Sequence, residues 1–137
     1  MGLVFQANPQ SGSSADRSLS ISDRAPLLRI AEIDPVSLQG GATGHQLAAE
    51  HPGIIDATNP EIPLDEFAAA VAATDLVITV DTMAAHCAGA IGHPVWIMVL
   101  YSPHWCWGSD EIRRLGIRLR GCFARMFDRI ARMSSRG

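Results

Sequence analysis

Cysteine is scarce in this 137-residue sequence, and the spacing of the three cysteines excludes the common cysteine-based sites. Cys87, Cys106 and Cys122 form no Cys-x-x-Cys pair and leave an odd thiol, so neither a disulfide framework nor a zinc site is indicated. His104 lies close to Cys106, but a metal site would need two more ligands at a suitable spacing. We therefore expect no metal and no cofactor.

Long apolar runs are also lacking. No run approaches the ~18 residues of a membrane span, and Val95–Leu100 has only the length of a strand. The N-terminus has neither the basic start nor the apolar stretch of a signal peptide. A content of 47% apolar and 18% charged residues is typical of a globular chain of one domain's length. We expect a cytoplasmic domain with no membrane span.

Lysine is absent, and the arginines are concentrated near the C-terminus. Residues 1–110 contain three arginines against twelve acidic residues, whereas residues 111–137 contain eight arginines against two. Apolar residues recur at helical spacing over 112–133, which predicts an amphipathic helix. Such a helix most often docks on its own domain, although an acidic membrane or nucleic acid could also attract it. We divide the chain into a domain over 1–110 and an arginine-rich tail over 111–137, and expect no nucleic-acid partner.

Strand and helix patterns alternate along the first hundred residues. Ser22 and Thr43 are expected to cap the first two helices. Strands alternating with helices at this pitch predict an α/β fold, a Rossmann-like parallel sheet with helices on both faces. The expected strands are 2–7, 35–38, 54–55, 75–80 and 95–100, and the expected helices are 22–30, 43–50, 64–73 and one beginning at residue 82.

Polar residues cluster where the strand ending at Val80 meets the next helix. Ligands of open parallel sheets bind at such junctions, and a helix N-terminus favours an anion such as phosphate. Asp81 could recognise sugar hydroxyls or could simply be the N-cap that accepts the N–H of Met83 or Ala84. Thr82 could donate its hydroxyl and its N–H to phosphate. His86 shares a helix face with Thr82, although a lone histidine among alanines is often structural.

Two other segments have weaker indications of a site. Gly40–Gly44 follows an expected strand and resembles a dinucleotide-binding turn, but it lacks the G-x-G-x-x-G spacing and reads as an ordinary turn. Arg17 lies in a serine- and glycine-rich loop, where it could reach a phosphate or remain a solvated charge. We keep Arg17 as a candidate contact.

The segment Asp75–Trp96 follows the pattern D-L-V-I-S-V-D-T-x-x-A-H-L-A-G-A-L-G-x-P-V-W nearly intact, and an aromatic loop follows as Ser102–Trp107. With this pattern, the segment from Asp75 to Asp110 resembles the C-terminal half of glycosyltransferases associated with tetratricopeptide repeats, relatives of the family nine heptosyltransferases. Weaker similarity covers Gln6–Pro9, Arg17-Ser18 and Val36–Gln39, so the resemblance spans about residues 2–110.

The resemblance implies one half of a GT-B enzyme, the half that holds the nucleotide sugar. It implies that five residues line the donor site: Asp81, Thr82, Met83, His86 and Arg17. The chain begins at the first strand of this half, so the acceptor-binding half and its catalytic base are expected on a missing N-terminal half or a partner chain. The family ending is replaced after about residue 110 by the arginine-rich tail, for which a frameshift is one explanation.

These expectations lead to two hypotheses of function. In the first, the chain is the nucleotide-sugar-binding domain of a glycosyltransferase that, when intact, transfers a sugar from a nucleoside diphosphate. In the second, it is a non-catalytic remnant or a protein-interaction module, and an exposed apolar surface would favour it. The catalytic residues, the nucleotide base and the acceptor are not identified by the sequence.

Overall fold

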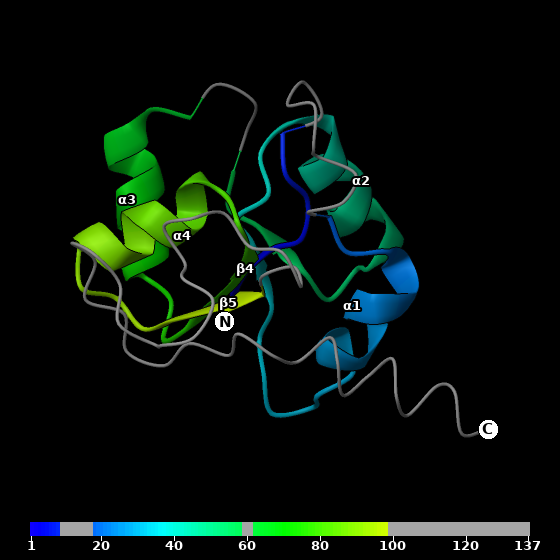
Figure 1. Cartoon of the computed structure of the whole chain (residues 1–137). Helices are drawn as coiled ribbons and strands as arrows, with labels where there is room; N and C mark the ends of the chain where they lie inside the picture. The colour runs from blue at the N-terminus through cyan, green and yellow to red at the C-terminus, as the bar shows by residue number, and fades with distance from the viewer. Residues whose placement is uncertain (9–17, 59–61, 99–137) are drawn as a thin grey trace.

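A computed structural model describes residues 1–8, 18–58 and 62–98 of the chain. It contains five short strands that form one all-parallel sheet in the order β3-β2-β1-β4-β5 (Figure 1). The expected Rossmann-like α/β fold is thereby confirmed. The strands are β1 (Gly2–Val4), β2 (Val36–Ser37), β3 (Ile55–Asp56), β4 (Val77–Val80) and β5 (Val95–Met98). The helices are α1 (Ile21–Leu28), α2 (Gly41–Glu50), α3 (Leu64–Ala72) and α4 (Met83–Ala90).

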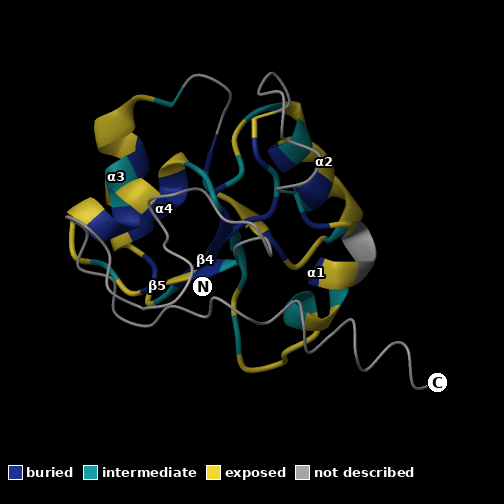
Figure 2. Ribbon diagram, in the orientation of Figure 1, coloured by how far each residue is buried: buried dark blue, intermediate teal, exposed yellow. Residues whose placement is uncertain are grey.

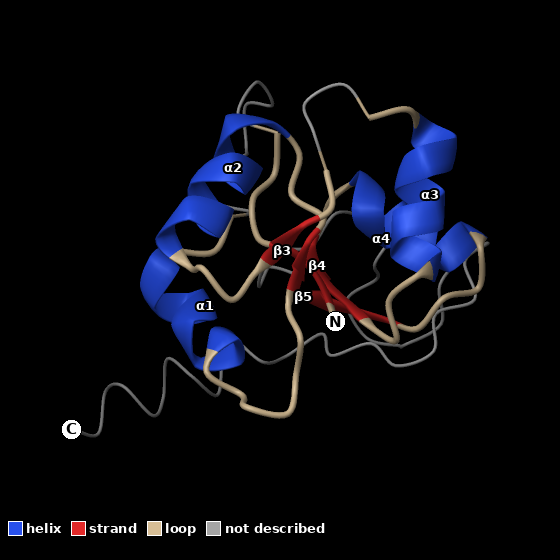
Figure 3. Ribbon diagram, turned by 180° about the vertical axis from the view of Figure 1, so that it is seen from behind, coloured by secondary structure: helices blue, strands red, loops and turns tan. Residues whose placement is uncertain are grey.

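Helices cover both faces of the sheet, as the sequence pattern predicts. Figures 1 and 3 show α1 and α2 together on one side of the strands and α3 with α4 on the other. Side chains alternate between the faces along each strand, since successive residues of a strand point to opposite sides. Leu3 and Phe5 belong to the apolar cluster on the α1–α2 side, whereas Val4 packs with Phe67 and Val71 of α3 on the other. The dark blue core in Figure 2 is therefore split into two layers by the sheet.

The strand order reverses between β1 and β4. The chain proceeds outward from β1 through β2 to β3, then returns through α3 to place β4 on the other side of β1. Val4 lies opposite Thr79 in this central pairing. The carboxyl ends of β1 and β4 thus meet at the topological switch point, the position where open α/β sheets bind ligands.

Two expected helix caps are wrong. The N-cap of α1 is Ser20, whose hydroxyl accepts from the N–H of Asp23 while the Asp23 carboxylate accepts from the N–H of Ser20. This reciprocal pair satisfies two backbone donors at the start of the helix. Ser22 is already inside α1, at its second position. The N-cap of α2 is Gly40 rather than Thr43, and the helix begins at Gly41, whose φ of 74° is readily accessible to glycine.

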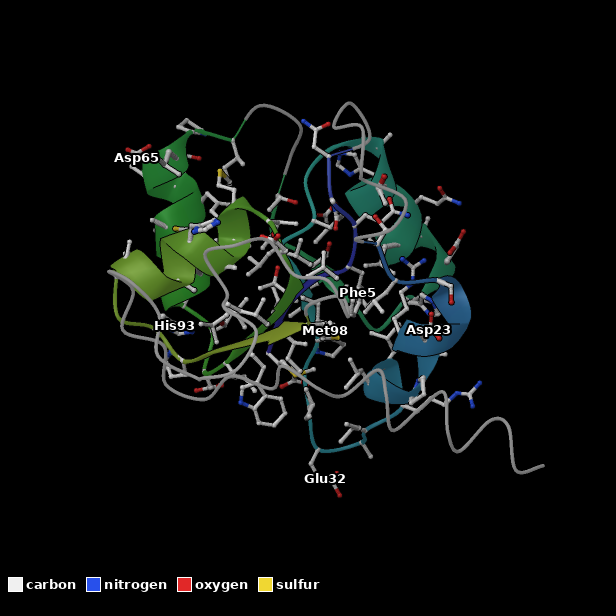
Figure 4. All side chains as sticks on the ribbon, viewed as in Figure 1. Phe5, Asp23, Glu32, Asp65, His93 and Met98 are labelled. Atoms are coloured by element: carbon white, nitrogen blue, oxygen red, sulfur yellow. The ribbon has the colours of Figure 1, made fainter. Side chains whose placement is uncertain are left out.

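One arginine is buried against the core. Arg24 of α1 is 5% exposed, and its guanidinium carbon lies over the ring of Phe5, 5.8 Å from the ring centroid. Its Nη2 atom is 3.8 Å from a carboxylate oxygen of Glu50, and its buried Nε makes no hydrogen bond. Phe5 itself lies near the middle of the molecule (Figure 4). This ion pair is incompletely satisfied, so it is a costly feature of the fold.

A histidine and a threonine meet where α3 and α4 lead into β4 and β5. The Thr74 hydroxyl donates to the carbonyl of Val71, so it accepts from Nε2 of His93, 3.1 Å away. His93 is labelled in Figure 4 below α4. Burial lowers the pKa of His93, and the nearby charge of Asp75 opposes this shift.

None of the helices in the described ranges is both long enough and apolar enough to span a membrane. The tail over 111–137 and the aromatic loop around Trp105 lie outside the described residues.

Candidate functional site

The candidate site is built on the turn between β4 and α4. All four residues of β4 are buried, because the strand lies between β1 and β5 and is covered on both faces. Asp81 and Thr82 follow at the carboxyl edge and are partly exposed. The small residues Ala84, Ala85 and Ala88 are buried against the sheet, so α4 can approach the strands closely. The first turn of α4 is thereby fixed beside the end of β4.

Thr82, not Asp81, is the N-cap of α4. It has the extended conformation of an N-cap, with φ −144° and ψ 177°, and its side chain makes no capping hydrogen bond. The alternative in which Asp81 is the N-cap is therefore wrong, because the helix begins one residue later than that role requires. The first N–H groups of an α-helix have no partner within the helix and carry its positive dipole end. The α4 terminus is consequently suited to an anion.

The hydroxyl of Thr82 is already engaged. Thr79 Oγ1 donates to the carbonyl oxygen of Val80 at 2.8 Å and lies 3.0 Å from Thr82 Oγ1. Since a hydroxyl has one proton, the proton of Thr79 is used, and Thr82 must donate to Thr79. An anion at this edge would therefore contact the backbone N–H groups in preference to the Thr82 hydroxyl.

Met83 and His86 both lie on the exposed side of α4. Met83 is 56% exposed at the first helical position, and His86 is exposed one turn further along, on the same face as Thr82. Cys87 is partly buried, and burial raises the pKa of its thiol, so the neutral thiol is its resting form. The structure thus groups Asp81, Thr82, Met83 and His86 at the start of one helix.

The residues that follow β1 lie at the same carboxyl edge of the sheet as Asp81 and Thr82. Ala7 donates its N–H to the Ser18 hydroxyl at 3.1 Å, and Leu19 donates its N–H to the carbonyl of Phe5 at 2.8 Å. These bonds bring together the two ends of the loop that contains Arg17. Arg17 itself lies outside the described residues.

Sequence reasoning missed a polar network on the β2 and β3 side of this edge. Gln39 follows β2 and bonds to the backbone of Phe5 and Gln6, while the Thr58 hydroxyl donates to the Gln39 carbonyl at 2.9 Å. His45 of α2 lies 2.9 Å from a carboxylate oxygen of Asp56 at the end of β3. The available signal was positional: each of these residues except His45 ends a strand or lies within two residues of a strand end, so they lie at the same carboxyl edge of the sheet as Asp81.

The charges of the described residues limit what this edge can bind. Asp56 and Asp81 supply negative charge, and the arginines in the described ranges are Arg24, paired with Glu50, and Arg29, at the far end of α1. Anion binding by these residues therefore relies on backbone N–H groups. No group of three or more His, Cys, Asp or Glu residues among the described positions could hold a metal ion.

Comparison with known proteins identifies no relative of this chain. No protein-family model matches the chain, and neither the curated proteins nor the solved structures contain a match.

Proposed function

We propose that this chain is the donor half of a glycosyltransferase and binds the diphosphate of a nucleotide sugar at the start of α4. The observation that supports this most directly is the position of Thr82–Ala84. An N-cap without a side-chain cap lies at the carboxyl end of β4, beside the point where the strand order reverses. The resemblance of Asp75–Trp96 to the family nine transferases supports a nucleotide sugar as the source of the diphosphate.

In this proposal each residue of the edge has a distinct part. The N–H groups of Met83 and Ala84 donate to phosphate oxygens, and the helix dipole favours the negative charge. His86 donates to the ligand from one turn further along the helix. Asp81, which phosphate would repel, accepts from sugar or ribose hydroxyls. Arg17 supplies the positive charge that the described part of the edge lacks.

The chain would supply binding and orientation, and a partner half would complete the reaction. Transfer with inversion needs a general base beside the acceptor hydroxyl. The acceptor half with this base would come from another part of the enzyme or a partner chain.

Substituting Met83 by proline tests the backbone contacts. Proline is favoured at the first helical position, and the extended Thr82 suits the residue before a proline, so the helix should be retained. The substitution removes one N–H. Loss of one charge-assisted hydrogen bond, about 1.5–3 kcal/mol, should weaken nucleoside diphosphate binding at least tenfold.

Met83→Ala is the matched control, because it truncates the same exposed side chain and keeps the N–H. Binding would be followed by saturation-transfer NMR with a panel of nucleoside diphosphates and their sugars, with His86→Ala as a second test. Equal affinities for the proline and alanine variants would exclude the backbone contact. A folded parent chain that binds none of the panel would exclude the donor site altogether.

One observation favours the interaction-module alternative. Leu64, at the first position of α3, is 63% exposed, and Met83 at the start of the neighbouring α4 is 56% exposed. Exposed apolar side chains at neighbouring helix starts are suited to another protein surface. A chain that self-associates, and does so less after Leu64→Asp, without binding nucleotide would support this alternative.

A further inference from the structure

The side chain of Gln39 makes three hydrogen bonds to the two residues that follow β1. Its Oε1 accepts from the N–H of Phe5 at 3.1 Å and from the N–H of Gln6 at 2.9 Å. Its Nε2 donates to the carbonyl of Gln6 at 3.3 Å. The carbonyl oxygen of Leu3 accepts from Leu38, so backbone pairing of β1 with β2 gives way to the Gln39 side chain within two residues.

A side-chain amide is suited to this position. The N–H groups of Phe5 and Gln6 need an acceptor, whereas the carbonyl oxygen of Gln6 needs a donor. The Gln39 amide meets both needs only with Oε1 toward the two N–H groups and Nε2 toward the carbonyl, so its orientation is fixed. A carboxylate of the same length would keep the two accepted bonds and lose the donated one. An apolar side chain would leave the N–H of Phe5, a residue 1% exposed, without this partner.

The backbone of Gln39 is held by hydrogen bonds from Thr58 and Ser37 and by the close approach of α2. The Thr58 hydroxyl, after β3, donates to the Gln39 carbonyl oxygen at 2.9 Å, and the Ser37 hydroxyl accepts the Gln39 N–H at 3.4 Å. Helix α2 approaches so closely that a Cβ added to Gly44 would lie 1.8 Å from the same carbonyl oxygen. Gln39 therefore connects β3 and α2 to the start of the β1–α1 loop.

We propose that Gln39 is a positioning residue for the ligand-binding edge. It holds Phe5 and Gln6, and with them the start of the β1–α1 loop, in register with the end of β4. Val4 lies opposite Thr79, so the segments that follow the two strands leave the sheet side by side. Binding by Gln6 and Ala7 together with the α4 terminus then depends on Gln39, although Gln39 does not touch the ligand. This part of the proposal rests on the proposed function.

The test uses the full chain and two readouts. Gln39→Met keeps the side-chain length and removes the amide, while Gln46→Met makes the same change at an exposed position of α2. Hydrogen exchange of the Phe5 and Gln6 amides should accelerate about tenfold in Gln39→Met, with little change at Leu38 and none in Gln46→Met. Gln39→Glu should restore much of the protection, because its carboxylate accepts from both N–H groups.

The second readout is the affinity for the nucleoside diphosphate that the parent chain binds most tightly. We expect Gln39→Met to weaken it at least fivefold, with no change in Gln46→Met. Unchanged exchange at Phe5 and Gln6 would overturn the positioning role whether or not any nucleotide binds. Faster exchange with unchanged affinity would overturn the link to the ligand. If exchange is faster in Gln39→Met but the parent chain binds no nucleotide, the proposed function is refuted, and Gln39 remains the residue that holds the backbone of Phe5 and Gln6.

Discussion

Replacing Gly44 by alanine tests the close approach of α2 to the residue that follows β2. An added Cβ would lie 1.8 Å from the carbonyl oxygen of Gln39 and 2.9 Å from its carbonyl carbon. Ordinary contact begins at 3.4 Å, so α2 or the Gln39 backbone must move by about 1.6 Å, the difference between 3.4 and 1.8 Å. The obstructing atoms belong to the backbone, which has no alternative rotamer to adopt.

Two opposing effects set the expected size of the change. Overpacking costs about 1–3 kcal/mol, and the backbone clash places Gly44→Ala at the upper end. The higher helix propensity of alanine returns about 1 kcal/mol. We expect a net loss of about 2 kcal/mol in the free energy of unfolding and a fall in Tm of roughly 8 °C.

Urea unfolding followed by circular dichroism measures this change. Gly53→Ala is the matched control, because nothing lies within 4 Å of an added Cβ there and its φ is not positive. The control should be neutral or stabilised by up to ~1 kcal/mol, since alanine restricts the unfolded chain. A Gly44→Ala variant as stable as the parent would refute the close contact between α2 and Gln39.

Two further predictions concern charged groups. Arg24→Met should leave the free energy of unfolding unchanged or raise it by ~1–2 kcal/mol, since it replaces a buried and incompletely paired cation with an apolar chain, and the side chain of Glu50 that remains is 36% exposed to solvent. Arg29→Met, at an exposed position, is the control, and a loss above ~1 kcal/mol specific to Arg24 would contradict this reasoning. His93 has a pKa lowered by burial from 6.5, so the native state binds fewer protons than the unfolded chain below pH 6.5. Stability should therefore fall as the pH decreases below 6.5, and urea midpoints at pH 8 and pH 5 should show a smaller fall in His93→Gln; equal falls would contradict the burial effect.

The order and type of the elements followed from the sequence because the periodicities were clear. Apolar residues at helical spacing predicted a helix over 64–73, and α3 spans Leu64–Ala72. The buried strand before Asp81 was predicted at 75–80 and observed at Val77–Val80. Element ends were less accurate: the strand predicted over 2–7 ends at Val4, because the next residues bond to the Gln39 side chain.

The contacts that organise the edge could not be predicted in the same way. Gln39 is 34 residues from Phe5, and its role depends on β1 and β2 being neighbours. From the sequence alone, Arg24 would be predicted to be an exposed charge on a helix, because its burial depends on the packing of α1 on Phe5. The β4–α4 junction was located from sequence because strand, turn and helix are contiguous there, whereas the direction of the Thr82 hydroxyl depends on Thr79 in three dimensions.

The most direct test of a donor site at the start of α4 is to locate the bound nucleotide on the chain. Amide signals of the ¹⁵N-labelled protein would be followed as the tightest-binding nucleoside diphosphate is added. We expect the largest shifts at Met83 and Ala84, with smaller ones at Gln6 and Ala7, and little change at His93. Shifts centred elsewhere, or no saturable shift in a folded chain, would contradict a donor site at the start of α4.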